Sequence, residues 1–307
     1  MINLYFAPLE GITTATYRNA HARMFGGCDG YYAPFITPSD IERISLKSLR
    51  DILPENNQGI PLKVQVLTAR SDSFFKFAKK AEPLGYNEFN INLGCPSQTV
   101  VKKGRGAGFL KDIDGLDRFL YEIFEKGGVE VSVKTRTGFF SGDEMEKLMK
   151  VYNKYPLSLL IIHPRARKDF YNGEPDMEVF KRAYESSTNP VCYNGNIFCK
   201  SDFDAIASSF PDLHSIMLGR GAIKNPAIFR EIKGGAPLSP EELTQFSHML
   251  IEDYMKKLES EYFTLNKLKE IWMYIMWNYP EEKKLLKAIK KCTKISEFER
   301  VVSTIPN

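Results

Sequence analysis

Residues 129–163 read VEVSVKTRTGFFSGDEMEKLMKVYNKYPLSLLIIH, and this stretch decides the fold class. It holds an apolar, β-branched run at 129–134, an amphipathic helical pattern at 143–155 and a second apolar run at 158–163. A strand, a helix and a further strand in succession form a unit whose two strands run parallel, because the helix carries the chain back to the same edge of the sheet. The stretch therefore predicts an α/β protein.

The same alternation extends over the first 235 residues of the chain. Helical patterns fall at 71–84 and 112–126, and the second ends at a Gly-Gly pair. Six further strands are expected near 3–7, 30–34, 62–67, 87–92, 190–194 and 214–218. With the two strands quoted above, the total is eight. Eight such units close into a (β/α)8 TIM barrel.

The pattern changes at 234–237, a Gly-Gly-Ala-Pro linker. Ser239, Pro240 and Glu242 then form a helix start, because serine caps, proline suits the first helical position and glutamate completes a capping box. Only helical patterns follow, near 240–259, 264–278, 281–292 and 296–303. We therefore expect a catalytic barrel domain at 1–235 and a small all-helical domain at 239–307.

Composition limits the class of protein. The 307 residues are 43% hydrophobic and 26% charged, as in ordinary globular proteins, and no apolar run approaches the roughly 20 residues of a membrane span. Five scattered cysteines without metal-ligand spacing, in a chain without a signal peptide, predict reduced thiols, no bound metal and a cytoplasmic protein. The net charge of +4 does not by itself identify a nucleic-acid partner.

Unusual polar residues gather where the predicted strands end, which is where TIM barrels carry their chemistry. Glycine-rich turns at 194–196 and 218–221 follow the last two strands and leave backbone N–H groups for a phosphate, and Arg220 adds a positive charge. The alternative is that these glycines serve only the turns. Two such turns at matching positions of the barrel favour a cofactor that carries a phosphate.

Two further strand residues suit a flavin. Lys134 is a cation at the end of an apolar strand, where burial is costly without an anionic partner, and an ammonium group stabilises the anionic reduced ring of a flavin. Gln65 offers a donor and an acceptor to the pyrimidine edge of such a ring. For Lys134 the alternative is a salt bridge inside the barrel mouth. For His163 there are two alternatives: a metal ligand, or a histidine whose hydrogen bonds are satisfied within the protein. The metal ligand is disfavoured because no second His or Cys lies at ligand spacing.

The loop at 92–97, Asn-Leu-Gly-Cys-Pro-Ser, and the glycine-rich run at 103–110 resemble the dihydrouridine synthase family, flavoenzymes that modify tRNA. Matches at 7–11, 133–136, 163–173, 194–197 and 218–226 support the resemblance over nearly the whole chain. The chain departs from the commoner family pattern at Thr14, at Thr68-Ala69, at Pro164 and at Asp169.

The resemblance implies bound FMN, NADPH as the reductant and RNA, tRNA in particular, as the substrate, with no obligate protein partner. It implies that Cys95 protonates C5 of the target uracil, which Asn92 also faces, after hydride reaches C6. An ordinary thiol has a pKa near ~8.5 and so carries its proton at neutral pH. The implied FMN contacts are Pro8, Leu9, Glu10, Gln65, Lys134, His163, Asn194, Gly195, Asn196, Gly219 and Arg220.

An RNA substrate also requires positive charge around the barrel mouth, because the target base must leave its stack to reach the site. Cations follow the predicted strand ends at Lys103, Arg105, Arg136, Arg165 and Arg167. In the tail, Lys283, Lys287, Lys290 and Lys294 fall at i, i+4, i+7 and i+11, which predicts one basic stripe on a helix. The alternative for this stripe is a solvated helix face.

Two other functions stay open at this point. A barrel that holds FMN and reduces a small pyrimidine explains the flavin and the thiol but leaves the basic loops without a role. An RNA-binding protein with an idle flavin site explains the cations but not the combination of Cys95, Lys134 and His163.

Overall fold

The computed structural model describes residues 2–38 and 49–306. Within them, eight parallel strands close into one barrel in which each strand pairs with the next and the last pairs with the first. The strands are β1 (Asn3–Phe6), β2 (Gly30–Tyr32), β3 (Leu62–Val66), β4 (Glu88–Leu93), β5 (Glu130–Gly138), β6 (Leu160–Ala166), β7 (Val191–Tyr193) and β8 (Ser215–Leu218). The predicted TIM barrel is confirmed. Strands β5 and β6 extend beyond the predicted ends, and their pairing shifts register between Arg136 and Gly138.

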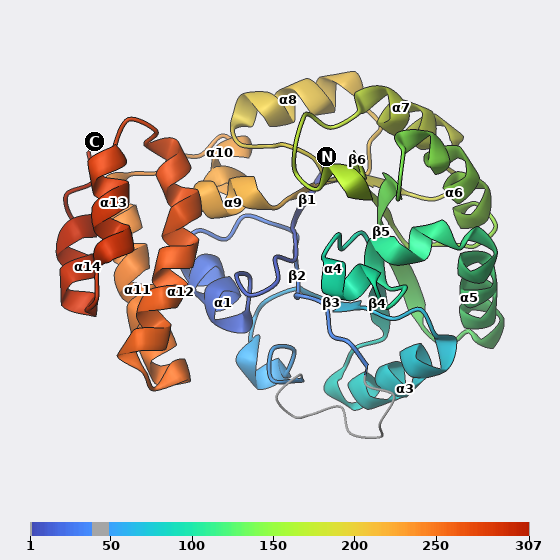
Figure 1. Ribbon diagram of the computed structural model, residues 1–307, viewed down its shortest axis with the longest axis horizontal. Coiled ribbons are helices and arrows are strands. Elements are labelled where there is room, and N and C mark those ends of the chain that lie inside the picture. The colour runs from blue at the N-terminus through green and yellow to red at the C-terminus, as the bar shows by residue number, and fades with distance from the viewer. Residues whose placement is uncertain (1, 39–48, 307) are drawn as a thin grey trace.

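Helices surround the barrel on the outside (Figure 1). Around the ring lie α1 (Ala15–Met24), α3 (Ser71–Ala81), α5 (Ile113–Lys126), α6 (Met145–Tyr152), α7 (Met177–Ser186), α8 (Lys200–Ser209), α9 (Arg220–Lys224) and α10 (Ile228–Ile232). A short helix, α4 (Gln98–Val101), follows the loop after β4.

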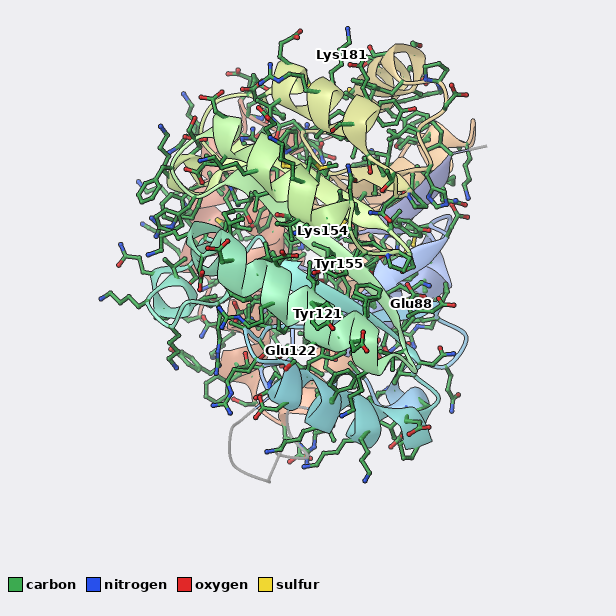
Figure 2. The ribbon with its side chains drawn as sticks, turned by 90° about the vertical axis from the view of Figure 1, so that its right-hand side faces the viewer. Glu88, Tyr121, Glu122, Lys154, Tyr155 and Lys181 are labelled. Atoms are coloured by element: carbon green, nitrogen blue, oxygen red, sulfur yellow. The ribbon has the colours of Figure 1, made fainter. Side chains whose placement is uncertain are left out.

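Helix α5 shows why these segments form helices on the barrel surface. Asp112 caps its start by accepting a hydrogen bond of 2.9 Å from the Gly115 N–H group. The side chains of Leu116, Phe119, Leu120 and Ile123, at helical spacing, are buried. Tyr121 lies on the opposite, outer face (Figure 2), where 56% of it is exposed.

The strands alternate between two environments. On β4, Phe89, Ile91 and Leu93 pack outward against the helices in the main hydrophobic core. The intervening Asn90 and Asn92 are buried as well. Because successive side chains of a strand point to opposite faces, both asparagines face the barrel interior. The interior of this barrel is therefore polar on one side, and a small apolar cluster that includes Tyr32, Ile161 and Met217 fills another part of it.

Four helices follow the barrel and pack beside it, next to α1 (Figure 1). They are α11 (Pro240–Leu258), α12 (Glu261–Ile275), α13 (Lys283–Lys291) and α14 (Ile295–Val302). The predicted capping box is present: Ser239 Oγ accepts a hydrogen bond from the Glu242 N–H group at 3.2 Å, and the Glu242 carboxylate accepts one from the Ser239 N–H group at 3.0 Å. Phe246 on α11 packs against Tyr17 and Phe25, with ring centroids 5.6 and 5.2 Å away, and joins the tail to the barrel. Within the described residues, every helix is too short or too polar to serve as a membrane span.

Candidate active site

Two adjoining cavities open at the carboxyl ends of the strands. Both are lined by Pro8, Leu9, Lys134, His163 and Tyr171. The first has about 480 Å³ of empty space and the second about 1000 Å³, counting their open mouths. The first continues over the loops after β7 and β8 to Asn194, Gly195, Gly219 and Arg220. The second continues to Glu10, Gln65, Asn92, Cys95 and Arg136. We call the two regions the anion end and the thiol end.

At the anion end, hydrogen-bond donors are left without partners in the protein. The backbone N–H groups of Gly195, Asn196 and Gly219 donate to no acceptor among the described residues. The Arg220 guanidinium donates to Asn196 Oδ1 at 3.0 Å and lies 4.5 Å from the ring centroid of Tyr171, but it forms no salt bridge with a described acid. Asn196 lies behind the cavity wall, where it also donates to Glu174. Such a set of donors favours an anionic ligand.

The glycines at this end have different reasons for being glycine. Neither Gly195 nor Gly219 has a positive φ, so backbone conformation alone does not require them. A Cβ on Gly195 would lie 1.9 Å from the hydroxyl oxygen of Tyr193, so packing inside the protein excludes it. A Cβ on Gly219 would touch only Ala7 and Leu9 at 3.5 Å or more. Close approach by a ligand is therefore a reason for glycine at 219 and not the main one at 195.

Lys134 lies where the two cavities meet, on β5 beside Asn92 of β4. Its ammonium group makes no hydrogen bond or salt bridge with any residue that the structure describes, so the alternative of an internal salt bridge is wrong. Burial, with a smaller contribution from the charge of Arg136, lowers the pKa of Lys134 to about 8. A cation that is costly to bury and has no protein partner is suited to the electron-rich edge of a cofactor.

At the thiol end, Cys95 sits on a loop that the protein holds from two sides. Asn92 Oδ1 accepts hydrogen bonds from the N–H groups of Cys95 at 2.9 Å and Gly94 at 3.1 Å. The Cys95 carbonyl accepts one from Ala107 at 3.1 Å, where the chain passes so close that a Cβ on Gly106 would lie 2.9 Å from that carbonyl oxygen. The thiol is half-buried, and burial raises its pKa although Arg136 and Lys134 act in the opposite direction. The thiol therefore keeps its proton at neutral pH.

A chain of buried amides leads from this loop into the barrel. Asn92 donates to Gln65 Oε1 at 2.7 Å, and Gln65 donates to Asn90 Oδ1 at 2.7 Å. Asn90 in turn donates to Ser132 Oγ at 2.9 Å. Each amide side chain thereby has a fixed orientation. Asn90 and Ser132 were not among the predicted site residues; the alternation of polar and apolar residues on their strands is the signal that identifies them.

Two arginines expected to face RNA phosphates are buried instead. Arg136 donates to the carbonyl oxygens of Gly94 at 2.9 Å, Ala166 at 3.0 Å and Phe170 at 2.7 Å, and only 1% of it is exposed. Arg165 donates to the carbonyls of Asn172 and Gly173 and is 3% exposed. Carbonyl acceptors in the neighbouring loops thus draw both side chains inward. They tie β5 and β6 to the loops after β4 and β6 and present no charge on the surface.

His163 is bonded within the protein through one of its two ring nitrogens. Its Nε2 atom lies 3.0 Å from an Arg165 guanidinium nitrogen, which is always a donor, so Nε2 accepts and the ring proton is assigned to Nδ1. Burial, followed by the charges of Arg136 and Lys134, keeps the pKa of His163 well below its ordinary value. Among the described residues no group of three metal-ligating side chains comes together.

The other predicted RNA-binding cations lie at the surface. Lys103 is exposed, and Arg105 and Arg167 are partly exposed, on loops beside Cys95. In the tail, Lys283, Lys287 and Lys290 are exposed on α13. Lys294 does not share that helix, because α13 ends at Lys291 and Lys294 caps α14, so the prediction of a four-lysine stripe on one helix is wrong. Tyr274 of α12, which the sequence did not single out, lines the thiol end together with Phe170.

An eight-stranded barrel with ligand cavities at the carboxyl ends of its strands defines a TIM-barrel protein, and solved structures share this fold. Histamine dehydrogenase from Rhizobium sp. 4-9 superposes with a TM-score of 0.57 and 12% identity over 82% of this chain and 48% of that one. Morphinone reductase gives a TM-score of 0.55 and 11% identity over 78% of this chain and 87% of that one.

Residues 5–305 match the sequence profile of the family "Dihydrouridine synthase (Dus)". The chain therefore belongs to the dihydrouridine synthase family and is an enzyme of that family. It is 26% identical to a tRNA-dihydrouridine(16) synthase of Salmonella typhimurium LT2 over 99% of each chain. The tRNA-dihydrouridine(16) synthase of Cupriavidus necator is 24% identical over 100% of this chain and 98% of its own. The tRNA-dihydrouridine synthase B of Pseudomonas putida KT2440 is 26% identical over 81% and 74%.

Proposed function

We propose that the enzyme reduces specific uridines of tRNA to 5,6-dihydrouridine, with FMN bound in the barrel mouth and NADPH as the reductant. The observation that carries the proposal is the set of groups that line the two adjoining cavities. They hold a protonated, half-buried thiol, a lysine without a protein partner and a set of unused backbone donors.

The residues of the cavities fit FMN. The N–H groups of Gly195 and Gly219, with Arg220, line the cavity and are the donors suited to its phosphate. Lys134 is suited to the electron-rich edge of the flavin ring, whereas the Gln65 amide is bonded to Asn90 and Asn92 and acts by holding the amide chain beside that ring. FMN, when bound and reduced, supplies the hydride that adds to C6 of uracil.

Cys95 supplies the proton that completes the reduction. The C5=C6 double bond becomes a single bond when C6 gains hydride and C5 gains the thiol proton, and the resulting thiolate recovers a proton from water. The raised pKa of Cys95 keeps the thiol protonated before each turnover. Asn92 holds the Cys95 backbone in place through its carbonyl oxygen, while its amide N–H is used by Gln65.

The cavities lie in the barrel mouth, which a base inside a stacked RNA cannot reach, so the target uridine has to be extruded from its RNA. Lys103, Arg105 and Arg167 then lie around the mouth, and the lysines of α13 lie on the neighbouring tail. Their positive charge suits the phosphates of a tRNA body. Arg136, which lines the thiol end from inside, braces the loops that surround the extruded base and does not reach the phosphates.

The test is the formation of dihydrouridine in an unmodified tRNA transcript with purified enzyme, FMN and NADPH. We expect a yellow protein that converts a small number of defined uridines. A wild-type enzyme that makes no dihydrouridine in any cellular tRNA, or that reduces free uracil as readily without RNA, would contradict the proposal. A protein that purifies colourless and takes up no FMN would support an idle flavin site instead.

A further inference from the structure

A row of aromatic and cationic side chains runs from the outer surface to the thiol end. It consists of Phe140, Phe139, Lys111, Arg167 and Phe170, and we call it the aromatic ridge. The rings of Phe139 and Phe140 are in edge-to-face contact with centroids 4.6 Å apart. Lys111 Nζ lies 4.8 Å from the Phe139 centroid, and the Arg167 guanidinium lies 5.4 Å from Phe139 and 4.9 Å from Phe170. Phe170 lines the same cavity as Cys95.

The rings at the two ends of the ridge are exposed although they are large and apolar. Phe140 is 62% exposed and Phe170 is 37% exposed. Neither Lys111 nor Arg167 forms a salt bridge with an acid among the described residues. Exposed rings that alternate with unpaired cations mark a surface for a ligand that offers both π-faces and negative charge.

The protein holds this surface rigid. The Glu144 carboxylate accepts hydrogen bonds from the N–H groups of Phe139 at 2.7 Å, Phe140 at 3.0 Å and Ser141 at 3.2 Å. The Glu144 carboxylate is thus engaged by the loop that carries the two rings. Arg167 Nε donates to the Pro96 carbonyl at 3.2 Å, which joins the ridge to the loop of Cys95.

Phe170 is held in an unusual conformation. Its φ is +50°, a region that side chains other than glycine rarely adopt, and strain of this kind persists only where surrounding contacts enforce it. The contact here is the hydrogen bond of 2.7 Å from buried Arg136 to the Phe170 carbonyl. The strained backbone places the inner ring of the ridge at the cavity rim.

We propose that the aromatic ridge binds the unpaired nucleotides that flank the target uridine, by stacking their bases on the rings and pairing their phosphates with Lys111 and Arg167. This inference rests on the proposed function. When one uridine occupies the thiol end, its chain neighbours must leave along the cavity rim, where the ridge begins. Bases of every kind stack on aromatic rings and guanidinium planes, and only unpaired bases have free faces.

The experiment measures the affinity of the full-length enzyme for an unmodified tRNA transcript at fixed salt, without NADPH. We expect Phe140→Ala to raise Kd at least fivefold, the lower limit for loss of one stacked base, with values up to about 100-fold in range. Phe140→Trp should bind as wild type does. Tyr121→Ala removes an equally exposed ring from the outer face of α5 (Figure 2), and as a matched control it should leave Kd unchanged. Phe140→Leu keeps the apolar volume and should weaken binding as alanine does.

A second arm identifies the nucleotides. A complementary oligonucleotide annealed over the loop that holds the target uridine removes its unpaired bases, and it should abolish the difference between wild type and Phe140→Ala. The inference is overturned if Phe140→Ala binds within twofold of wild type, or if the difference persists on the annealed RNA, since duplex or protein-like contacts would then explain the ridge. Because only binding is measured, the two failures are distinguishable: a wild-type enzyme that binds through the ridge but forms no dihydrouridine would refute the proposed function and leave the ridge as a site for unpaired nucleotides only.

Discussion

The two ends of the barrel mouth differ in how their polar groups are used. At the thiol end, Asn92, Gln65 and Asn90 bond to one another and to the Cys95 backbone, and the donors of Arg136 end on carbonyls. At the anion end, the N–H groups of Gly195 and Gly219 have no partner among the described residues. The difference indicates two tasks. Satisfied groups fix an atom of the protein itself, whereas unsatisfied groups are kept for a ligand that arrives from outside.

Each arrangement has its energetic consequence. A buried polar group without a partner costs about 1–3 kcal/mol, so the amide chain is stable only while all its members are present. Free donors at the anion end avoid this cost because water reaches them through the open cavity. Lys134 combines features of both ends: its side chain is largely enclosed where the two cavities meet, and its ammonium group has no partner among the described residues. Substitutions at these positions test the distinction.

The largest effect on activity should follow from removing the sulfur atom of Cys95, which the thiol end holds in place. Cys95→Ala should lower the rate of dihydrouridine formation by about 10²–10⁴-fold, the range for loss of a general acid, because C5 then lacks its proton donor. FMN content, measured from the absorbance of the purified protein, should stay at the wild-type value, since the anion end is untouched. Product formation by Cys95→Ala at the wild-type rate would remove the thiol from the mechanism.

Lys134→Met should have opposite effects on the cofactor-free and the FMN-loaded protein. Loss of an uncommitted charge removes a partner for the cofactor, so FMN affinity should fall by about 10-fold or more, as for a charge-assisted contact. The cofactor-free variant should nevertheless unfold at a higher temperature than cofactor-free wild type, because a costly buried charge has gone. Fluorescence titration measures the FMN affinity, and thermal unfolding measures the stability of the cofactor-free protein. A lower unfolding temperature for the cofactor-free variant would mean that Lys134 has a partner after all.

The same lysine gives a pH dependence with a defined sign. Its pKa is about 8 when folded and 10.5 when unfolded, so between these values the unfolded chain binds more protons than the folded one. The stability contributed by this group therefore rises with pH from about 8 to about 10.5 and is constant below that window. Urea unfolding of the two cofactor-free proteins at several pH values should show that the free energy of unfolding rises between about pH 8 and 10.5 in wild type relative to Lys134→Met. Parallel curves for the two proteins would contradict the lowered pKa.

A smaller effect is expected from Asn90, which lines neither cavity. Asn90→Leu leaves the Gln65 amide N–H and the Ser132 hydroxyl without their partner, so stability to urea should fall by about 1–3 kcal/mol. Because the amide chain ends at Cys95, alkylation of Cys95 by iodoacetamide should change its rate and pH midpoint, which a purely structural loss would not alter. An unchanged alkylation profile would show that the amide chain does not position the thiol.

The contrast between the two ends also explains which features the sequence could predict. Periodicity and turn residues predict the barrel and the tail helices, because those signals are local. Cys95, Lys134 and Arg220 are predicted to share a site because parallel strands end on one face. The inward course of Arg136 depends on carbonyl acceptors 30 to 42 residues away, and that of Arg165 on the irregular turn at 172–173, neither of which spacing reports. Lys294 was misplaced because the lysine spacing was extended past position 292, where the predicted helix already ends.

The smallest effect should come from cations remote from both ends. Replacing Lys283, Lys287 and Lys290 by glutamine should weaken tRNA binding and reduce the slope of log K against log salt by up to about one for each RNA phosphate that these lysines neutralise. Lys181→Gln, on the outer face of the barrel (Figure 2), removes a matched exposed charge and should leave the slope unchanged. Since these lysines touch neither the amide chain nor the free donors, FMN affinity and the rate at saturating RNA should stay as in wild type. An unaltered salt slope in the triple variant would identify the α13 lysines as a solvated helix face and leave RNA attraction to the cations of the barrel mouth.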